Sequence, residues 1–576
     1  MLKLLRYLKP YSASVAAVFG LTFLHSIAEL LLPTLLAAIV DTGIVNGNVP
    51  YILQRGGIML LVALGGAACI ITGNYLSSRV ALGFGADLRS SIFEHVESFS
   101  LPEFDRIGTA SLITRTTNDI TQIQMVAVIV LRMMIGAPLM CIGGIIMALS
   151  RDVQLSKVLL VIIPFLGLAA TFAASRVIPL FRTMQRKLDR LNLVLRENLT
   201  GIRVVRAFNR TQQEQKRFDR ANEELTATAI KVNKIMAAIM PAMMISLNFT
   251  AIAVIWFGGL RIDAGQMQLG DLIAFLQYIM LIMFSLIMVS MMFIMLPRAS
   301  VSADRINEVL AIVPGITDPA PAVTAKGAAK GLVELKEVAF SYPGAEQPVL
   351  SGITFSAAPG EVTAIIGGTG SGKTTLVNLL PRFYDVSSGA ICIDGVDLRQ
   401  MAQAELRAKI GLVPQKAFLF SGSVADNIRF GFEEATDEEI RKAAAIAQAG
   451  GFIAELPGGF DAPIAQGGAN LSGGQKQRLA IARALVRRPR IFIFDDSFSA
   501  LDFKTDARLR AALKEETGAA TVFIVAQRVS TIMDADRIVV LESGKIAGMG
   551  THKELLNSCP VYREIVLSQL AEEEIA

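Results

Sequence analysis

The chain has 576 residues, which is too long for one domain and corresponds to about three domains of ~150 residues each. Hydrophobic residues make up 52% of it and the mean hydropathy is +0.50, yet 18% of the residues are charged. This mixture excludes an ordinary soluble protein and predicts a membrane part joined to a soluble part. The net charge of +5 is too small to indicate a nucleic-acid partner. The four cysteines have no metal-ligand spacing and are expected to be isolated thiols: Cys69, Cys141, Cys392 and Cys559.

Residues 1–12 predict a basic amphipathic helix on the inner membrane surface. A cleaved signal peptide is disfavoured, because no small-residue cleavage site follows and the apolar run continues past residue 38. Six stretches then have the ~20 apolar residues needed to cross ~30 Å of hydrocarbon. They are residues 13–38, 55–78, 128–150, 155–178, 236–259 and 270–296. We expect a transmembrane domain over residues 13–300.

The charges of the connecting loops predict the orientation. Residues 179–235 are rich in lysine and arginine, whereas residues 41–54 contain neither. The positive-inside rule places the basic loops, the N-terminus and everything after the sixth span in the cytoplasm. The two long cytoplasmic loops are expected to extend the membrane helices, and their tips, near residues 99–107 and 207–218, are expected to contact another domain.

A linker and an α/β domain follow. Residues 301–332 form the predicted linker, because most of this stretch is rich in proline, alanine and glycine. Over residues 333–568, short β-rich runs alternate with helical segments, which predicts a sheet domain. Residues 569–576 form a tail whose acidic end is expected to fray.

A phosphate-binding loop lies near the start of this domain. The sequence Gly-Gly-Thr-Gly-Ser-Gly-Lys-Thr over residues 367–374 directly follows the apolar run 361–366, which reads as a buried strand. In this pattern backbone N–H groups surround phosphates, Lys373 reaches the terminal phosphates and Thr374 binds Mg²⁺. Further along, Phe492–Phe494 form an apolar strand that delivers Asp495 to the magnesium side of the site.

Together with Leu-Ser-Gly-Gly-Gln at 471–475 and Ser-Ala-Leu-Asp at 499–502, these motifs resemble the nucleotide-binding domain of an ABC transporter. With six preceding spans, the whole chain resembles a half-transporter of the ABC exporter type. The implied fold class is an α-helical membrane domain followed by an α/β P-loop ATP-binding cassette. The implied ligands are ATP and Mg²⁺, in the cell membrane of a bacterium with the cassette in the cytoplasm.

The resemblance also implies roles for individual residues. Tyr342 would stack on adenine, Gln415 would reach Mg²⁺ and sense the membrane domain, and Ser472, Gly474 and Gln475 would close over ATP held by the opposite subunit. The implied nucleotide-binding set is Tyr342, Gly367, Gly368, Thr369, Gly370, Ser371, Gly372, Lys373, Thr374, Thr375, Ser472, Gly473, Gly474, Gln475 and Asp502. The implied Mg²⁺ ligands are Thr374, Gln415 and Asp495.

Two catalytic positions depart from the family pattern. Asp496 stands where the family has Glu, and its carboxylate falls roughly an ångström short of the attacking water, which can cost ~10²-fold in rate. Gln527 stands where the family has a switch His, and its amide cannot ionise. A third departure, Gln466 in place of Glu, has no assigned consequence. The signature 471–475 is intact.

The pattern predicts a heterodimeric exporter of hydrophobic or amphipathic compounds, of the multidrug type. One ATP site would be degenerate, and a second half-transporter would supply the missing Glu and His to the competent site. Two alternatives stay open. The chain could belong to an exporter-fold lipid flippase or metal-chelate transporter, or it could be a non-transporting regulatory ATP-binding partner.

Polar and methionine side chains within the spans have two interpretations. His25 and Glu29 share one helix face and either line a wet pathway or satisfy each other. Arg132 is expected to snorkel or pair. A stripe of flexible side chains either lines a cavity for varied compounds or packs against helices and lipid; it comprises Met280, Phe284, Met288, Met291 and Met295, with Met236, Met240 and Met243 on the preceding span.

Overall fold

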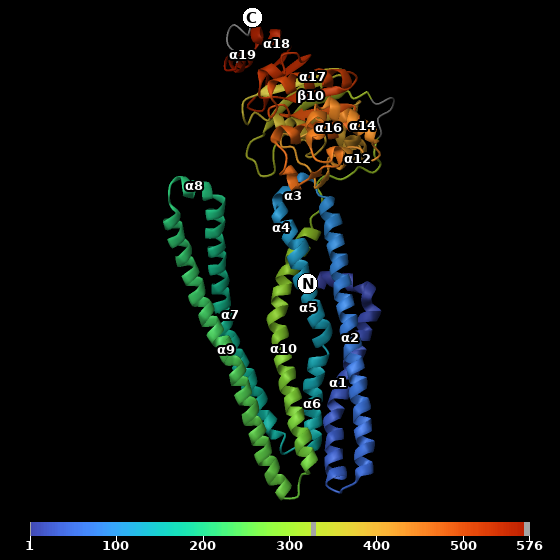
Figure 1. The fold of residues 1–576 in the computed structure, drawn as a ribbon, viewed down its shortest axis with the longest axis vertical. Coiled ribbons are helices and arrows are strands. Elements are labelled where there is room, and N and C mark those ends of the chain that lie inside the picture. Colours follow the sequence, from blue (N-terminus) through green and yellow to red (C-terminus); the bar gives the residue numbers. More distant parts are fainter. Residues whose placement is uncertain (1, 324–329, 570–576) are drawn as a thin grey trace. The chain divides into compact units, whose positions relative to one another are not determined.

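The computed structural model describes residues 2–323 and 330–569 (Figure 1). For some helical positions only the backbone is described: residues 2, 166, 169, 170, 172–174, 239, 240, 243, 290–295, 297 and 298. The chain separates into two compact units, and each is described by itself. Unit 1 comprises residues 1–97 and 110–312, and unit 2 comprises residues 98–109 and 313–576.

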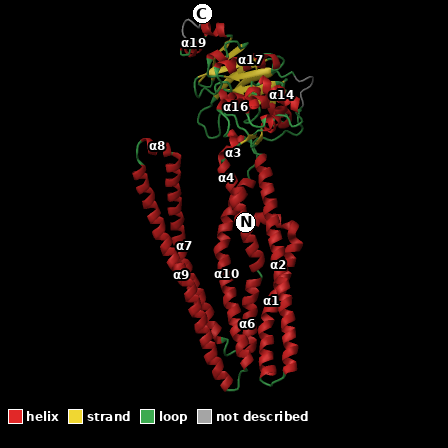
Figure 2. Cartoon of the chain, in the orientation of Figure 1, coloured by secondary structure: helices red, strands yellow, loops and turns green. Residues whose placement is uncertain are grey.

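Unit 1 is helical (Figure 2). Its elements are η1 (Leu2–Tyr11), α1 (Ser12–Ala38), η2 (Ile39–Ile44), α2 (Val49–Glu97), α4 (Thr109–Thr114), η3 (Arg115–Asp119), α5 (Ile120–Met133), α6 (Gly136–Arg151), α7 (Lys157–Thr200), α8 (Ile202–Ala207), α9 (Thr211–Asp263) and α10 (Leu269–Leu310). Helices α1 and α2 run side by side, as do α7 and α9 (Figure 1). At 1.5 Å per residue, the 53 residues of α9 exceed twice the ~30 Å of hydrocarbon, so this helix extends far beyond the membrane.

Five helical stretches in the described residues are long and apolar enough to cross a membrane. They are Lys3–Ile44, Val49–Glu97, Thr109–Arg151, Met244–Asp263 and Leu269–Val289. The predicted fourth span, residues 155–178, lies in α7 but is not among them, and several of its side chains fall outside the described residues. The prediction of a helical membrane domain is confirmed, whereas the count of six spans is not.

The described residues of unit 2 form three sheets. The strands are β1 (Val333–Phe340), β2 (Leu350–Ala357), β3 (Val362–Gly367), β4 (Ser388–Ile393), β5 (Val396–Asp397), β6 (Ile410–Val413), β7 (Gly422–Ser423), β8 (Pro463–Ile464), β9 (Ile491–Asp495), β10 (Thr521–Val525), β11 (Arg537–Glu542) and β12 (Lys545–Gly550). The largest sheet has the order β12-β11-β3-β10-β9-β6, and all of its pairs are parallel except β11 with β12. The others are β2-β1-β4-β5 and β7-β8.

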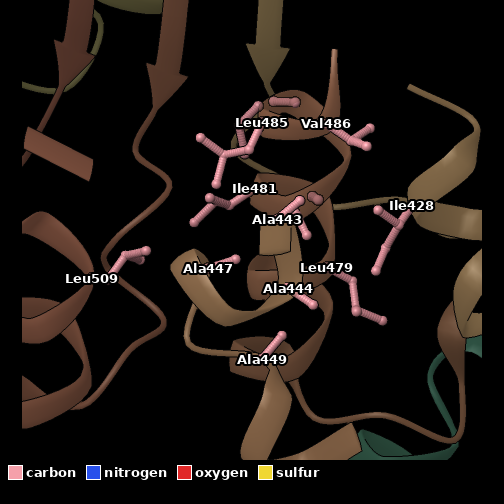
Figure 3. Close-up of a cluster of buried hydrophobic side chains, with 14 of the residues drawn as sticks. Ile428, Ala443, Ala444, Ala447, Ala449, Leu479, Ile481, Leu485, Val486 and Leu509 are labelled. Carbon is pink, nitrogen blue, oxygen red and sulfur yellow. The ribbon is translucent and has the colours of Figure 1, made fainter. Parts of the chain in front are cut away.

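Unit 2 also contains helices. They are α3 (Leu101–Ile107), α11 (Lys373–Leu379), α12 (Gln403–Ala408), α13 (Val424–Arg429), α14 (Asp437–Ile446), α15 (Gly450–Glu455), α16 (Gly473–Val486), α17 (Phe503–Glu516), α18 (His552–Ser558) and α19 (Pro560–Leu567). The largest core cluster joins α14 to α16 (Figure 3), where the small side chains of Ala443, Ala444 and Ala447 face bulkier ones such as Leu479 and Ile481. This close packing fixes α16, whose N-terminus carries the signature motif.

Candidate functional site

Three neighbouring parallel strands end at one edge of the main sheet. In the register of the sheet, Val525 of β10 pairs with both Asp495 of β9 and Ile365 of β3. Strand β9 is buried at every position, which explains its uninterrupted apolar sequence before the aspartate. The P-loop, the acidic pair 495–496 and Gln527 therefore follow adjacent strand ends, where α/β sheets commonly bind ligands.

The P-loop has the backbone geometry that its glycines permit. Gly370 and Gly372 have φ values of 82° and 96°, which disfavour residues with a side chain. A Cβ on Gly367 would lie 2.1 Å from the carbonyl oxygen of Leu541, whereas nothing lies within 4 Å of a Cβ on Gly368 or Gly370. The loop is packed against the sheet on one side and open on the other, as a phosphate cradle requires.

Several polar groups of this loop could bind a ligand. The Lys373 ammonium donates to the carbonyl oxygens of Gly367 (2.9 Å) and Gly368 (2.7 Å), and burial lowers the pKa of Lys373. The buried Oγ of Ser371 has no hydrogen-bond partner among the described residues. Thr374 Oγ1 donates to Asp495 Oδ1 at 3.2 Å. These groups fit a triphosphate and its Mg²⁺, which Thr374 and Asp495 would hold.

Asp496 is engaged by two amides. Gln527 Nε2 donates to Asp496 Oδ2 at 2.8 Å, and Gln415 Nε2 donates to the same oxygen at 3.3 Å. Asp496 has a φ of 47°, a left-handed conformation that Asp tolerates better than most residues. Burial raises the pKa of Asp496, and the hydrogen bond from Gln415 opposes that shift. The structure thus brings all three sequence-predicted catalytic positions into one hydrogen-bonded group.

Tyr342 lies beside the P-loop. Its hydroxyl is 3.0 Å from Thr375 Oγ1, and its ring packs edge-on against Phe340 and Tyr384, with centroids 4.9 and 5.4 Å away. Stacking of Tyr342 on adenine remains a prediction. Tyr384 was not predicted from the sequence, and its hydroxyl donates to Asp105 of α3 at 3.3 Å. No local pattern links residues 279 positions apart, so only the fold could identify this pair.

The signature motif opens α16. Ser472 Oγ accepts from the backbone N–H of Gln475, and Gln475 Oε1 accepts from the N–H of Ser472, so the two residues cap the helix. A Cβ on Gly474 would lie 3.0 Å from the carbonyl oxygen of Ala500, which brings the signature next to the 499–502 motif. Asp502 caps α17 by accepting from the N–H of Thr505 at 2.9 Å. Nothing lies within 4 Å of a Cβ on Gly473, so the start of α16 is open there. The first N–H groups of a helix have no partner within it and can bind a ligand.

Comparisons with known proteins agree with this architecture. Residues 15–286 match the family described as ABC transporter transmembrane region, and residues 350–499 match the family described as ABC transporter. An ABC transporter ATP-binding protein of Mycobacterium tuberculosis is 45% identical over 573 residues, which cover 99% of this chain and 98% of the relative. The chain belongs to the ABC transporter family.

Other relatives extend the likeness to exporters. An ABC transporter ATP-binding protein of Bacillus subtilis is 39% identical over 100% of this chain and 99% of its own length. The solved structure of a bacterial Atm1-family ABC exporter with ATP bound matches with a TM-score of 0.81 and 26% identity, covering 97% of this chain and 99% of that one. This ABC transporter is therefore a membrane-embedded ATPase of the exporter type, with its nucleotide-binding domain in the cytoplasm, and its family binds ATP with Mg²⁺.

Within the membrane unit of this ABC transporter, the predicted polar residues contact neighbouring helices. His25 Nδ1 donates to the carbonyl oxygen of Gly66 at 3.1 Å, and no ion pair with Glu29 occurs among the described residues. Arg132 donates to the hydroxyls of Ser77 (2.9 Å) and Ser78 (2.8 Å), so it pairs as expected.

The methionine stripe is described only in part. The side chains of Met236, Met280, Phe284 and Met288 are exposed in this chain. Those of Met240, Met243, Met291 and Met295 lie outside the described residues. Both interpretations of the stripe therefore stay open.

Proposed function

We propose that this ABC transporter chain is one subunit of a heterodimeric exporter that moves hydrophobic or amphipathic compounds out of a bacterial cell. Its own site, formed by the P-loop, Asp495 and Asp496, would retain ATP and cleave it slowly. A second half-transporter with Glu and His at the corresponding positions would complete the competent site, using the signature of this chain.

The proposal rests on Asp496, whose carboxylate accepts hydrogen bonds from two glutamine amides. A general base must lie within hydrogen-bond reach of the proton that it abstracts from the attacking water. Here the shorter aspartate carboxylate already accepts from Gln415 and Gln527, both of which are amides that cannot take up a proton. The binding parts of the site, by contrast, have the geometry expected of a phosphate cradle. Binding without efficient cleavage is the function that this combination supports.

A lipid cargo is the second candidate, because one relative, 32% identical over 94% of this chain, is an ATP-dependent lipid A-core flippase of Chromobacterium violaceum. Transport assays separate the two candidates. Affinity purification of the tagged chain from its own host, followed by mass spectrometry, identifies the partner. The purified pair is then reconstituted into vesicles and supplied with a cationic amphipathic dye or with a fluorescent lipid. ATP-dependent dye movement supports the proposal, and movement of the lipid alone supports the flippase.

A further inference from the structure

The loop that carries Gln527 is held by a residue from the far end of the chain. Gln569 lies just beyond α19, and its side-chain amide forms two hydrogen bonds with this loop. Its Nε2 donates to the backbone carbonyl oxygen of Gln527 at 2.8 Å, and its Oε1 accepts from the backbone N–H of Val529 at 2.9 Å. One planar amide therefore satisfies the backbone on both sides of residue 528.

These bonds meet a local need of the backbone. Val529 opens the short 3₁₀ turn η7 (Val529–Thr531), and the first N–H groups of a helical turn have no partner within the turn. Val529 is buried, so an unpaired N–H there would destabilise the turn. Gln569 supplies the acceptor for this N–H group from outside the loop.

Packing fixes the position from which Gln569 acts. Tyr562 and Val566 of α19 are buried in one apolar cluster with Ala526 and Val529 of the loop that carries Gln527. Helix α19 and the loop thus share a core, and Gln569 follows that helix by two residues. The contact is made by an anchored element, although the side chain of Gln569 itself is exposed.

We infer that Gln569 is a positioning residue for the nucleotide site, and that it acts through Gln527. By holding the carbonyl group of Gln527 and the N–H group of Val529, it keeps the Gln527 side chain on Asp496, 2.8 Å from the carboxylate oxygen. The C-terminal segment thereby controls how long this chain retains ATP. The inference rests on the proposed function, in which this site holds nucleotide rather than cleaving it.

The first test is hydrogen exchange on the full-length chain without nucleotide. In the variant Gln569→Ala, exchange of the peptide covering residues 525–531 should rise several-fold, because Val529 loses its acceptor. Gln569→Glu keeps an acceptor for Val529 but has no N–H for the carbonyl group of Gln527. Its exchange should therefore lie between those of the unmodified chain and Gln569→Ala. Asn557→Ala is the matched control, since Asn557 is an exposed amide that donates only to Lys553 within α18. Unchanged exchange in Gln569→Ala would overturn the inference.

The second test follows release of a fluorescent ATP analogue with Mg²⁺ from the same proteins. Each hydrogen bond contributes about a two- to tenfold factor, so loss of both predicts a release rate about four- to hundredfold faster in Gln569→Ala. The same substitution should have no further effect in a Gln527→Ala background, because coupled residues are not additive. A full effect in that background would contradict an action through Gln527. A large fall in melting temperature would indicate a purely structural role and contradict the inference as well.

The two tests also separate this inference from the proposed function. Rapid ATP turnover by the chain alone would contradict the slow site. Hydrogen exchange without nucleotide would still report whether Gln569 holds the loop.

Discussion

Asp496 is the residue on which the proposed slow cleavage depends. It accepts from two glutamine amides through the same oxygen, and its aspartate chain is one methylene shorter than the glutamate of the family pattern. The neighbouring Asp495 points to Thr374 instead. Adjacent carboxylates thus have different partners, one suited to a metal ion and the other restrained.

Restoring the family residues at both positions should restore cleavage. We predict that Asp496→Glu combined with Gln527→His raises ATP hydrolysis at this site at least ~10-fold, because general-base catalysis contributes about 10²–10⁴-fold. Asp496→Glu alone should give less, since Gln527 would still donate to the carboxylate. The measurement is steady-state phosphate release by the purified chain. Lack of any gain in the double variant would mean that other residues cause the slow rate.

His552 should make the stability of the cassette depend on pH. Its Nδ1 lies 2.6 Å from the hydroxyl of the buried Tyr562, and burial lowers the pKa of His552 below its usual 6.5. The unfolded chain therefore binds the proton more readily than the folded chain, and stability is lost as pH falls below about 6.5. At pH 7.5 this cost is absent.

The predicted outcome is a melting temperature of the cassette that decreases between pH 7.5 and pH 5.5. His552→Gln keeps a polar side chain but does not titrate, so its decrease should be smaller. Differential scanning calorimetry of the full chain measures both. Identical pH profiles for the two proteins would refute a role for His552.

Among individual residues, those in contiguous motifs could be predicted from the sequence, whereas contacts between residues far apart in the sequence could not. The P-loop, Asp496 and Gln527 lie in local patterns that are read directly from the sequence. Tyr384 with Asp105, and Gln569 with Gln527, are joined only when the sheet and its helices have folded. Nothing in the residues around positions 105 or 569 indicates those partners.

Helix α3 is the element that brings a membrane-domain loop into the cassette unit. The prediction that the loop tip near residues 99–107 contacts another domain agrees with its grouping with residues 313–576. Its Asp105 accepts from Tyr384, and burial, with Asp105 nearby, raises the pKa of Tyr384 to about 12. The phenol therefore keeps its proton at physiological pH and remains a donor.

Substitutions of Tyr384 should separate ring packing from hydrogen bonding. Tyr384→Phe keeps the ring against Phe340 and Tyr342 and should cost less than about 1 kcal/mol of unfolding free energy. Tyr384→Ala removes the ring and should cost about 3 kcal/mol or more. Urea unfolding of the cassette in the full chain provides the comparison. Equal losses would show that the hydrogen bond to Asp105, rather than the packing, dominates.

Elements with strong periodic signals were predicted well. The strand over residues 492–494 is part of β9, and the run 361–366 corresponds to β3 within one residue at each end. The π-helical turn η3 (Arg115–Asp119) could not be predicted, because it depends on contacts with α10, including a hydrogen bond from Ser302 to Asp119. The span 155–178 stays a prediction, because several of its side chains lie outside the described residues.

The whole chain combines a helical membrane domain with an ATP-binding cassette; composition predicted a membrane part and a soluble part, and the motifs indicated the cassette. What composition could not supply is the partner. In the proposed heterodimer, the signature at the start of α16 and the Asp496 site of the same chain would contribute to two different ATP sites. A homodimer would repeat the restrained site twice, whereas a heterodimer would contain it once.

The rate of ATP hydrolysis by the purified chain, alone and mixed with its partner half-transporter in the same lipid nanodiscs, tests this asymmetry most directly. We predict that the chain alone binds ATP but hydrolyses it about 10²-fold more slowly than the mixture, because a misplaced base costs a factor of that size. Rapid hydrolysis by the chain alone, at the rate of the mixture, would contradict the account.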